Sequence, residues 1–279
     1  MTAEIIRTVL VVILLTAILT GAITVTLAVF RRRFPADPRV NDNDSIGIYL
    51  VIVSATYGVF LAFVTYALWG QRNQAQQFIE TEAAELNFLF HVSRGFPEPT
   101  RSQLLQLIRT YNNNIISLEW PAMVHSELKF LYGRNPAIDT IIDILTRFIP
   151  STDTERSLCE QALEVAEKVY IARRMRLLSA RSSVGLYVWL VIIVGAIVNV
   201  VPTLFLRVRH LTYQFVAKFC LVALLLLVIL TIRDLDNPFR GSWRVQPEAY
   251  ILNNQRMDAV LSEGRENSAP SIPPLSSPK

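Results

Sequence analysis

The stretch IGIYLVIVSATYGVFLAFVTYALWG, residues 46–70, decides the fold of this chain. It contains no Asp, Glu, Lys or Arg. At about 1.5 Å per residue, a helix of this length crosses the ~30 Å hydrocarbon core of a lipid bilayer. A charged side chain near the centre of such a helix would cost about 2.5–3.5 kcal/mol. The stretch therefore predicts a membrane-spanning helix.

Three further apolar segments, at residues 5–30, 184–206 and 215–232, have the same character, with no charge near the middle of any of them. The first is longer than the roughly 7–15 apolar residues of a signal peptide, and three arginines follow it directly. We expect it to be a retained helix. The predicted fold class is all-α: a four-span helical integral membrane protein with a helical soluble insert between spans 2 and 3.

The composition, 52% hydrophobic and 18% charged, suits this class. Residues 1–70 hold the first helix pair, residues 71–183 the soluble insert, and residues 184–241 the second helix pair with a Pro-Phe motif. Residues 242–279 form a C-terminal tail, which we expect to be disordered from about residue 263, where Ser and Pro are frequent.

The insert is predicted to be helical because apolar side chains recur in it at helical spacing, with no sustained alternation of the kind that marks strands. Span 2 has no stop signal, so one long helix should continue through residues 75–92 and end near Phe96-Pro97. Thr100 or Ser102 is expected to cap the next helix. One side of that helix is apolar, at Leu104, Leu107, Ile108, Tyr111, Ile115 and Leu118.

Three more features set the limits of the helices in the insert. Glu119-Trp120-Pro121 should end or kink the helix that precedes it. Further helices are expected to follow Asn135-Pro136 and to begin within residues 151–153.

The charge pattern favours a membrane surface over nucleic acid, because the formal net charge is only +4 and arginines cluster beside the spans. These clusters, at residues 31–33, 173–176 and 207–209, can contact anionic headgroups. Basic residues near the spans do not settle orientation. If basic residues in short loops are given more weight than those in long loops, the short loops are placed in the cytoplasm. The unweighted count of basic residues instead places the insert there.

Enzyme signatures are missing, so we expect no catalytic residues, no cofactor and no metal site. The three histidines are far apart, and neither a phosphate-binding loop nor a nucleophile elbow is present. Glu80, Glu82 and Glu85 could be imagined as metal ligands, but a solvated helix face explains them without a His or Asp at a helical offset. Cys159 and Cys220 are not expected to form a disulfide.

Polar residues in the spans leave two interpretations open. Ser54, Ala55 and Gly58 in span 2 either let helices approach closely or line a pore. Asn199 in span 3 is expected to form an interhelical hydrogen bond.

Two passages resemble the bestrophins. Span 2 with its continuation, YGVFLAFVTYALWGQRNQA at residues 57–75, is similar to the bestrophin second helix. DNPFRG at residues 236–241 is similar to the acidic-x-Pro-Phe-Gly element after the last bestrophin span. Together with EWPAM at residues 119–123, these passages most resemble a bacterial bestrophin-like family of undefined function.

The resemblance implies a homo-oligomeric ion channel, a pentamer by analogy, in the bacterial inner (plasma) membrane, with small inorganic ions and lipid as its other partners. Its second helices would surround an apolar neck, to which Val51, Ala55 and Val59 contribute. Such a neck gates by wetting and dewetting. A non-conducting membrane scaffold or sensor, whose soluble helices bind a partner, is the alternative.

The motif after span 4 consists of Asp236, Pro238, Phe239 and Gly241. Pro238 should end the span, and Phe239 should turn back to pack at the interface with Arg240 among headgroups. Animal bestrophins continue with a calcium-binding acidic run. Here Arg240-Gly-Ser-Trp-Arg244 follows instead, so we expect no calcium site of that kind.

Overall fold

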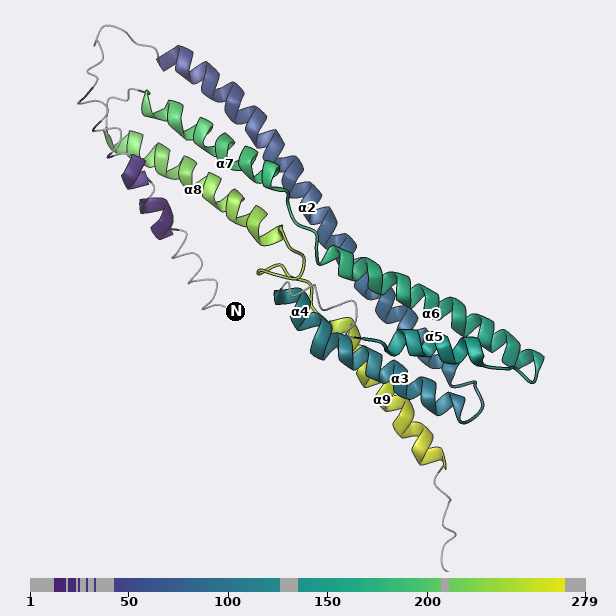
Figure 1. Cartoon of the computed structure of the whole chain (residues 1–279). Coiled ribbons are helices and arrows are strands. Elements are labelled where there is room, and N and C mark those ends of the chain that lie inside the picture. Colours follow the sequence, from purple (N-terminus) through teal and green to yellow (C-terminus); the bar gives the residue numbers. More distant parts are fainter. Residues whose placement is uncertain are drawn as a thin grey trace, which may run out of the picture. The chain divides into compact units, whose positions relative to one another are not determined.

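The structure is a computed structural model, and it describes residues 13–18, 20–23, 25, 29, 33, 43–125, 135–206 and 211–268. The regular structure in these residues is helical, without a strand, which confirms the predicted all-α class for the part described (Figure 1). The helices are α2 (Asn43–Ser93), α3 (Thr100–Asn114), the π-helix η1 (Ile115–Glu119), α4 (Trp120–His125), α5 (Ala137–Arg147), α6 (Asp153–Ser179), α7 (Leu186–Val200), the short 3₁₀ helix η3 (Val201–Leu204), α8 (Leu211–Leu235) and α9 (Glu248–Ser268).

Three helical stretches among the described residues are long and apolar enough to cross a membrane: Asn43–Ser93, Leu186–Leu204 and Thr212–Leu235. They coincide with the second, third and fourth segments expected from the sequence. The first expected segment, residues 5–30, lies largely outside the described residues. A fourth span therefore stays a prediction.

The described residues form two compact units. The first unit contains α2 as far as Gly70, together with α7 and α8. The second contains α2 from Gln71 onward, together with α3, α4, α5, α6 and α9. Each unit has a hydrophobic core of its own.

In the first unit, α2 lies beside α7 (Figure 1), and its buried side chains join those of α7 and α8 in one core. The buried positions on α2 follow helical spacing, which is the pattern of an apolar stripe facing a core. The core residues are Tyr57, Leu61, Leu68, Ile192, Ile232 and Leu235.

In the second unit, α2 again buries one side, now among α3, α5, α6 and α9. Helices α3 and α5, and α5 and α6, lie side by side along much of their length. The apolar side predicted for α3 is used here, because its central residues are fully buried. The largest apolar side chains of this core include Ile79, Leu86, Phe90, Leu104, Ile108, Tyr111, Ile115 and Met123.

The helix boundaries follow local signals, with one correction. Helix α2 ends at Ser93, close to Phe96-Pro97 as expected. Helix α6 begins after Thr152, whose hydroxyl accepts from the Glu155 N–H at 3.1 Å. Neither Thr100 nor Ser102 caps α3. Instead, the Glu98 carboxylate accepts from the backbone N–H of Ser102 at 3.3 Å and from its hydroxyl at 2.7 Å.

The expected break at Glu119-Trp120-Pro121 is a π-helical segment through which the chain stays helical. Helix α3 passes into η1 and then into α4, which contains Pro121. Proline lacks an N–H and crowds the carbonyl four residues earlier, so a wider helical turn before it relieves that conflict. The π-helix ends at Glu119, and its carboxylate points into the core of the second unit.

Helix α9 was not anticipated from the sequence. Tyr250 and Met257 on α9 are fully buried in the core of the second unit. The expected disorder from residue 263 overlaps the last turns of this helix, which is helical to Ser268. Residues 269–279 lie outside the described part of the chain.

Candidate functional site

Helix α2 contacts α7 through Tyr57, whose ring lies against Gly195. The hydroxyl of Tyr57 donates to the carbonyl oxygen of Ile192 at 2.6 Å. A Cβ atom on Gly195 would lie only 2.2 Å from the Tyr57 ring, so only glycine admits the ring at this position. The close approach in this unit is therefore made at Gly195 of α7.

A second contact between the same helices involves Ser54 and Asn199. The Ser54 hydroxyl donates to Oδ1 of Asn199 at 2.7 Å, and Nδ2 of Asn199 donates to the Gly195 carbonyl at 2.8 Å. The interhelical hydrogen bond predicted for Asn199 is confirmed. Of the two interpretations of Ser54, the structure supports packing. A Cβ atom added at Gly58 would have no neighbour within 4 Å, so this glycine makes no close helix contact within the described residues.

The three expected neck residues lie on the opposite side of α2. Val51 and Val59 are 69% and 58% exposed, and Ala55 is also exposed. At about 100° per residue, these three positions lie roughly 120–200° around the helix from Tyr57. They point away from α7 and α8 and have no partner within the described residues of the chain.

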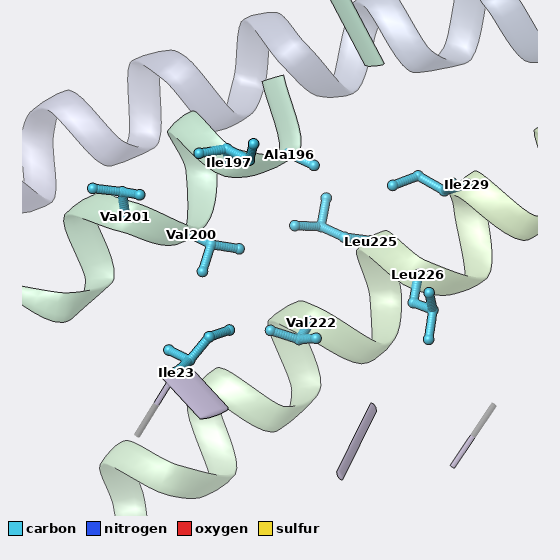
Figure 2. A pocket seen from close by; sticks show the side chains of 9 residues that line it. All are labelled: Ile23, Ala196, Ile197, Val200, Val201, Val222, Leu225, Leu226 and Ile229. Atoms are coloured by element: carbon cyan, nitrogen blue, oxygen red, sulfur yellow. The ribbon is translucent and has the colours of Figure 1, made fainter. Parts of the chain in front are cut away.

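Membrane-capable helices also line an open apolar pocket with a cavity volume of about 290 Å³ (Figure 2). Ile23 contributes to its lining, and the other side chains come from α7, η3 and α8. Its surface offers no hydrogen-bonding side chain, so it suits a hydrocarbon chain and not a polar ligand. Within the described residues, no group of three or more His, Cys, Asp or Glu side chains could hold a metal ion.

The turn after α8 depends on Asp234 and Gly241. The Asp234 carboxylate accepts from the backbone N–H groups of Ser242, at 2.9 and 3.0 Å, and of Trp243, at 3.3 Å. Gly241 has φ of +81°, which disfavours other residues, and a Cβ there would lie 2.1 Å from Oδ1 of Asp234. Glycine is therefore required for this carboxylate to reach the backbone.

The other residues of the segment after α8 contact distant parts of the chain. Asp236 accepts from the backbone N–H of Val184 just before α7. Phe239 is 1% exposed and packs edge-on against Trp120, with ring centroids 5.5 Å apart, in the core of the second unit. Nε of Arg240 donates to the Val124 carbonyl at 2.6 Å. The structure thus gives Phe239 and Arg240 partners within the protein, where the sequence suggested the bilayer interface and lipid headgroups.

Among the described residues of the second unit, four charged residues are buried: Glu82, Glu119, Arg173 and Arg176, which we call the charge cluster. Arg176 is fully buried and binds Glu82 through two contacts, Nε to Oε2 at 2.7 Å and Nη2 to Oε1 at 3.1 Å. Its Nη2 also donates to Oε2 of Glu119 at 2.6 Å. Arg173 completes the cluster by donating to Oε1 of Glu119 from Nε at 3.1 Å and Nη2 at 2.8 Å.

Two tyrosines complete the hydrogen bonding of Glu82. The Tyr111 hydroxyl donates to Oε1 at 2.7 Å, and the Tyr250 hydroxyl donates to Oε2 at 3.0 Å. The Arg176 guanidinium also lies over the Tyr250 ring, 5.8 Å from its centroid. Side chains from α2, α3, η1, α6 and α9 thus meet at one buried site with two positive and two negative charges.

The two guanidiniums of the charge cluster favour the ionised form of Glu119. Burial acts to raise the pKa of Glu119, but the neighbouring guanidiniums of Arg176 and Arg173 outweigh it, so this pKa lies below its usual value. Burial raises the pKa of Tyr111 and Tyr250 well above the usual value, with a further contribution from the Glu82 charge. Both hydroxyls therefore keep their protons and act as donors.

The charge cluster corrects two sequence interpretations. Glu82 is fully buried, whereas Glu80 is exposed as a solvated face requires. Arg173 and Arg176 were expected at lipid headgroups and instead lie in the core. The burial of Glu82 could have been predicted from helical spacing. Glu82 follows Ile79 by three residues and precedes Leu86 by four, and both of these residues are fully buried.

The three membrane-capable helices among the described residues define this protein as a helical membrane protein. The chain belongs to the Bestrophin-like family, whose domain model matches residues 17–250. Among curated proteins, none matches the sequence.

Two solved structures share the fold. One, described as a membrane protein with a proline-to-alanine substitution, superposes with a TM-score of 0.61 at 12% identity, over 90% of this chain and 97% of the other. The second is a bacterial bestrophin homologue from Klebsiella pneumoniae with a leucine-to-threonine substitution. It gives a TM-score of 0.60 at 14% identity, over 90% of this chain and 98% of the other. At these identities the likeness concerns the fold alone.

Proposed function

We propose that this protein is the subunit of a homo-oligomeric ion channel in which the exposed side of α2 lines the pathway. The observation that carries the proposal is the division of α2 into two sides. Tyr57, Leu61 and Leu68 bury one side against α7 and α8, while Val51, Ala55 and Val59 on the other side are exposed and contact no other part of the described chain. A ring of such helices around an axis would bury the unpartnered side and enclose an apolar constriction.

The dimensions of this exposed side suit a pore through a bilayer. Apolar exposed residues extend from Ile48 to Tyr66, which corresponds to about 27 Å at roughly 1.5 Å per residue. Val51, Ala55 and Val59 follow one another at successive turns within it. Small apolar side chains at a constriction control conduction by admitting or excluding water, so we propose a neck that gates by wetting.

Membership of the Bestrophin-like family and the fold shared with a bacterial bestrophin homologue support this assignment. By analogy with bestrophins we propose a pentamer in the bacterial inner membrane that passes small inorganic ions. The residues 71–183 would form its soluble part.

For the alternative, a scaffold whose soluble helices bind a partner, the apolar side of α3 would be the natural binding face, and its central residues are not accessible. Leu104, Ile108 and Ile115 on α3 are fully buried in the core of the second unit. Substitution there would unfold the unit before it tested any partner.

The test is thiol modification of a single cysteine on the exposed side of α2. In a Cys220→Ser background, Val59→Cys should give currents that a charged methanethiosulfonate reagent blocks, because the reagent reaches a water-filled pathway. Leu190→Cys on α7, also an exposed apolar position, is the matched control and should not be blocked. Equal block of both variants, or of neither, would contradict lining by α2, and absence of current in the parent would contradict a channel.

A further inference from the structure

A second apolar hollow lies in the first unit, between α2 and α8, and we call it the α2 groove. Small residues of α2, Ser54, Gly58 and Ala62, line it together with leucine and valine side chains of α8. Its volume is about 660 Å³, and its surface is almost entirely apolar. A Cβ atom at Gly58 would meet nothing within 4 Å, and Leu224 of α8 is 61% exposed. The described residues therefore leave the groove open.

Large apolar side chains project from another flank of α2. Ile52 and Phe63, which we call the α2 ridge, are 58% and 69% exposed. Measured around the helix from Tyr57, at about 100° per residue, Ile52 and Phe63 point to about 220° and 240°. Gly58 points to about 100°, and Ala55, in the middle of the proposed neck, to about 160°. The groove and the ridge therefore border the neck on its two flanks, roughly 60–80° to either side.

This arrangement has a geometric consequence for a ring of copies. When the neck side of every α2 faces the axis, each helix meets one neighbour on each flank. The groove flank of one copy then faces the ridge flank of the next, so that large side chains meet a hollow. A head-to-tail contact of this kind joins two different surfaces of one chain and can close into a ring.

We propose that the α2 groove of each subunit binds the α2 ridge of the neighbouring copy, with Phe63 as the central inserted side chain. The inference rests on the proposed channel function and adds to it the surfaces through which the copies meet. Phe63 directly follows Ala62 in the sequence, so the ridge of one copy and the groove of the next lie at nearly the same height, about 1.5 Å apart, in a symmetric ring. An aromatic side chain also buries more area than an aliphatic one, roughly 150–250 Å².

The lining of the groove favours a protein helix over a lipid chain as its occupant. Ser54, Gly58 and Ala62 follow one another at intervals of four residues. Small residues at this spacing let two helix backbones approach closely, and such close packing drives helix association in lipid. A fluid acyl chain gains nothing from the same spacing. The groove is also wide enough, at about 660 Å³, to hold a phenyl ring beside an added methyl group at Gly58.

The first experiment is disulfide cross-linking between two single-cysteine variants in a Cys220→Ser background. Ala62→Cys and Phe63→Cys, carrying different tags, are co-expressed as full-length chains and oxidised in membranes with copper phenanthroline. A cross-linked dimer that carries both tags is expected, because a disulfide requires the two Cβ atoms to lie about 3.5–4.5 Å apart. Each variant expressed alone should give much less dimer. Leu190→Cys, at an exposed position of α7, replaces Phe63→Cys in the control mixture and should give no mixed dimer.

The second experiment measures dissociation of the oligomer on dilution in detergent. Phe63→Ala should raise the subunit concentration at half-dissociation at least about tenfold, as expected when a central aromatic side chain of an interface is truncated. Because Phe63 is 69% exposed in the single subunit, its removal should leave the core of the first unit intact. Leu190→Ala is the matched control and should leave the half-dissociation concentration unchanged.

The outcomes separate this proposal from the channel itself. A verified oligomer that gives no mixed dimer, or that cross-links chiefly through like positions, would overturn the contact between groove and ridge and leave the channel standing. Dissociation that Phe63→Ala leaves unchanged would overturn the contact as well, and would leave the groove to lipid. A folded parent protein that is monomeric at every concentration would overturn the homo-oligomeric channel, and this contact with it.

Discussion

At the scale of single residues, the second unit is organised by buried charge. Among the described residues, Arg176 is the largest side chain that is fully buried, and it contacts two carboxylates from two other helices. Taking ions out of water costs several kcal/mol each, and the cost is offset only where every charge is paired. In the charge cluster the pairing is complete, because both oxygens of Glu82 and of Glu119 accept hydrogen bonds.

Replacing Glu82 by glutamine keeps the shape of the side chain but leaves Arg176 with half of its negative partners. We expect Glu82→Gln to lower the free energy of unfolding by about 3–5 kcal/mol, the typical cost of breaking a buried ion pair. Glu80→Gln, two residues away and exposed, should change it by no more than about 0.5 kcal/mol. Denaturant unfolding of both variants in detergent checks this, and equal stability of the two would contradict the role given to the cluster.

The lowered pKa of Glu119 makes the second unit sensitive to acid. Because this pKa is lower in the folded than in the unfolded state, ionised Glu119 stabilises the fold above its unfolded pKa. That stabilisation is lost as the pH falls from the unfolded pKa, about 4.3, through the folded pKa. The difference in unfolding free energy between the parent and Glu119→Gln should therefore shrink below about pH 4. A difference that stays constant across this range would show that Glu119 does not contribute through its charge.

The residues of the charge cluster could be found in part from the sequence. The helical phase of α2 places Glu82 with Ile79 and Leu86, which marks it as a buried acid. Its partners could not be assigned, because Arg176 and Glu119 lie on segments separated from it by long stretches of chain. The π-helix could not be predicted from the sequence either. Pro121 indicates an irregularity in the helix, but it does not indicate the direction in which the neighbouring side chains point.

At the scale of elements, α2 determines most of the architecture. Its length could be predicted, because no proline or turn signal interrupts the chain between residues 46 and 92. Its division into a packed and an exposed side could not be read from residues 46–70, where nearly every side chain is apolar. Contacts with α7 make that division, and they depend on the small size of Gly195 and on two hydrogen bonds.

Gly195→Ala should separate α2 from α7, because the added methyl group would meet the Tyr57 ring at 2.2 Å. We expect a loss of about 1–3 kcal/mol in stability, as for other overpacked sites. Gly58→Ala is the control: with nothing within 4 Å, it should be neutral or slightly stabilising through helix propensity. Unfolding of the two variants in detergent measures the contrast, and a stable Gly195→Ala protein would show that the Tyr57 contact is not close-packed.

At the scale of the whole molecule, the sequence already indicated the family. Apolar segments separated by a helical insert, together with the Pro-Phe element, were sufficient because hydrophobic length and the proline stop are properties of the chain itself. The partners of the Pro-Phe element were not predictable. The burial of Phe239 beside Trp120 brings together segments more than a hundred residues apart, and no local pattern encodes that contact.

The central claim is that copies of this chain assemble around the exposed side of α2 and conduct ions. Single-channel recording of the purified protein in a planar bilayer, with its oligomeric mass measured on the same sample, tests this most directly. The account predicts an oligomer with discrete currents, and a changed conductance after Val59→Ser with assembly unaltered. A folded monomer, or a verified oligomer that stays silent in every variant, would contradict it.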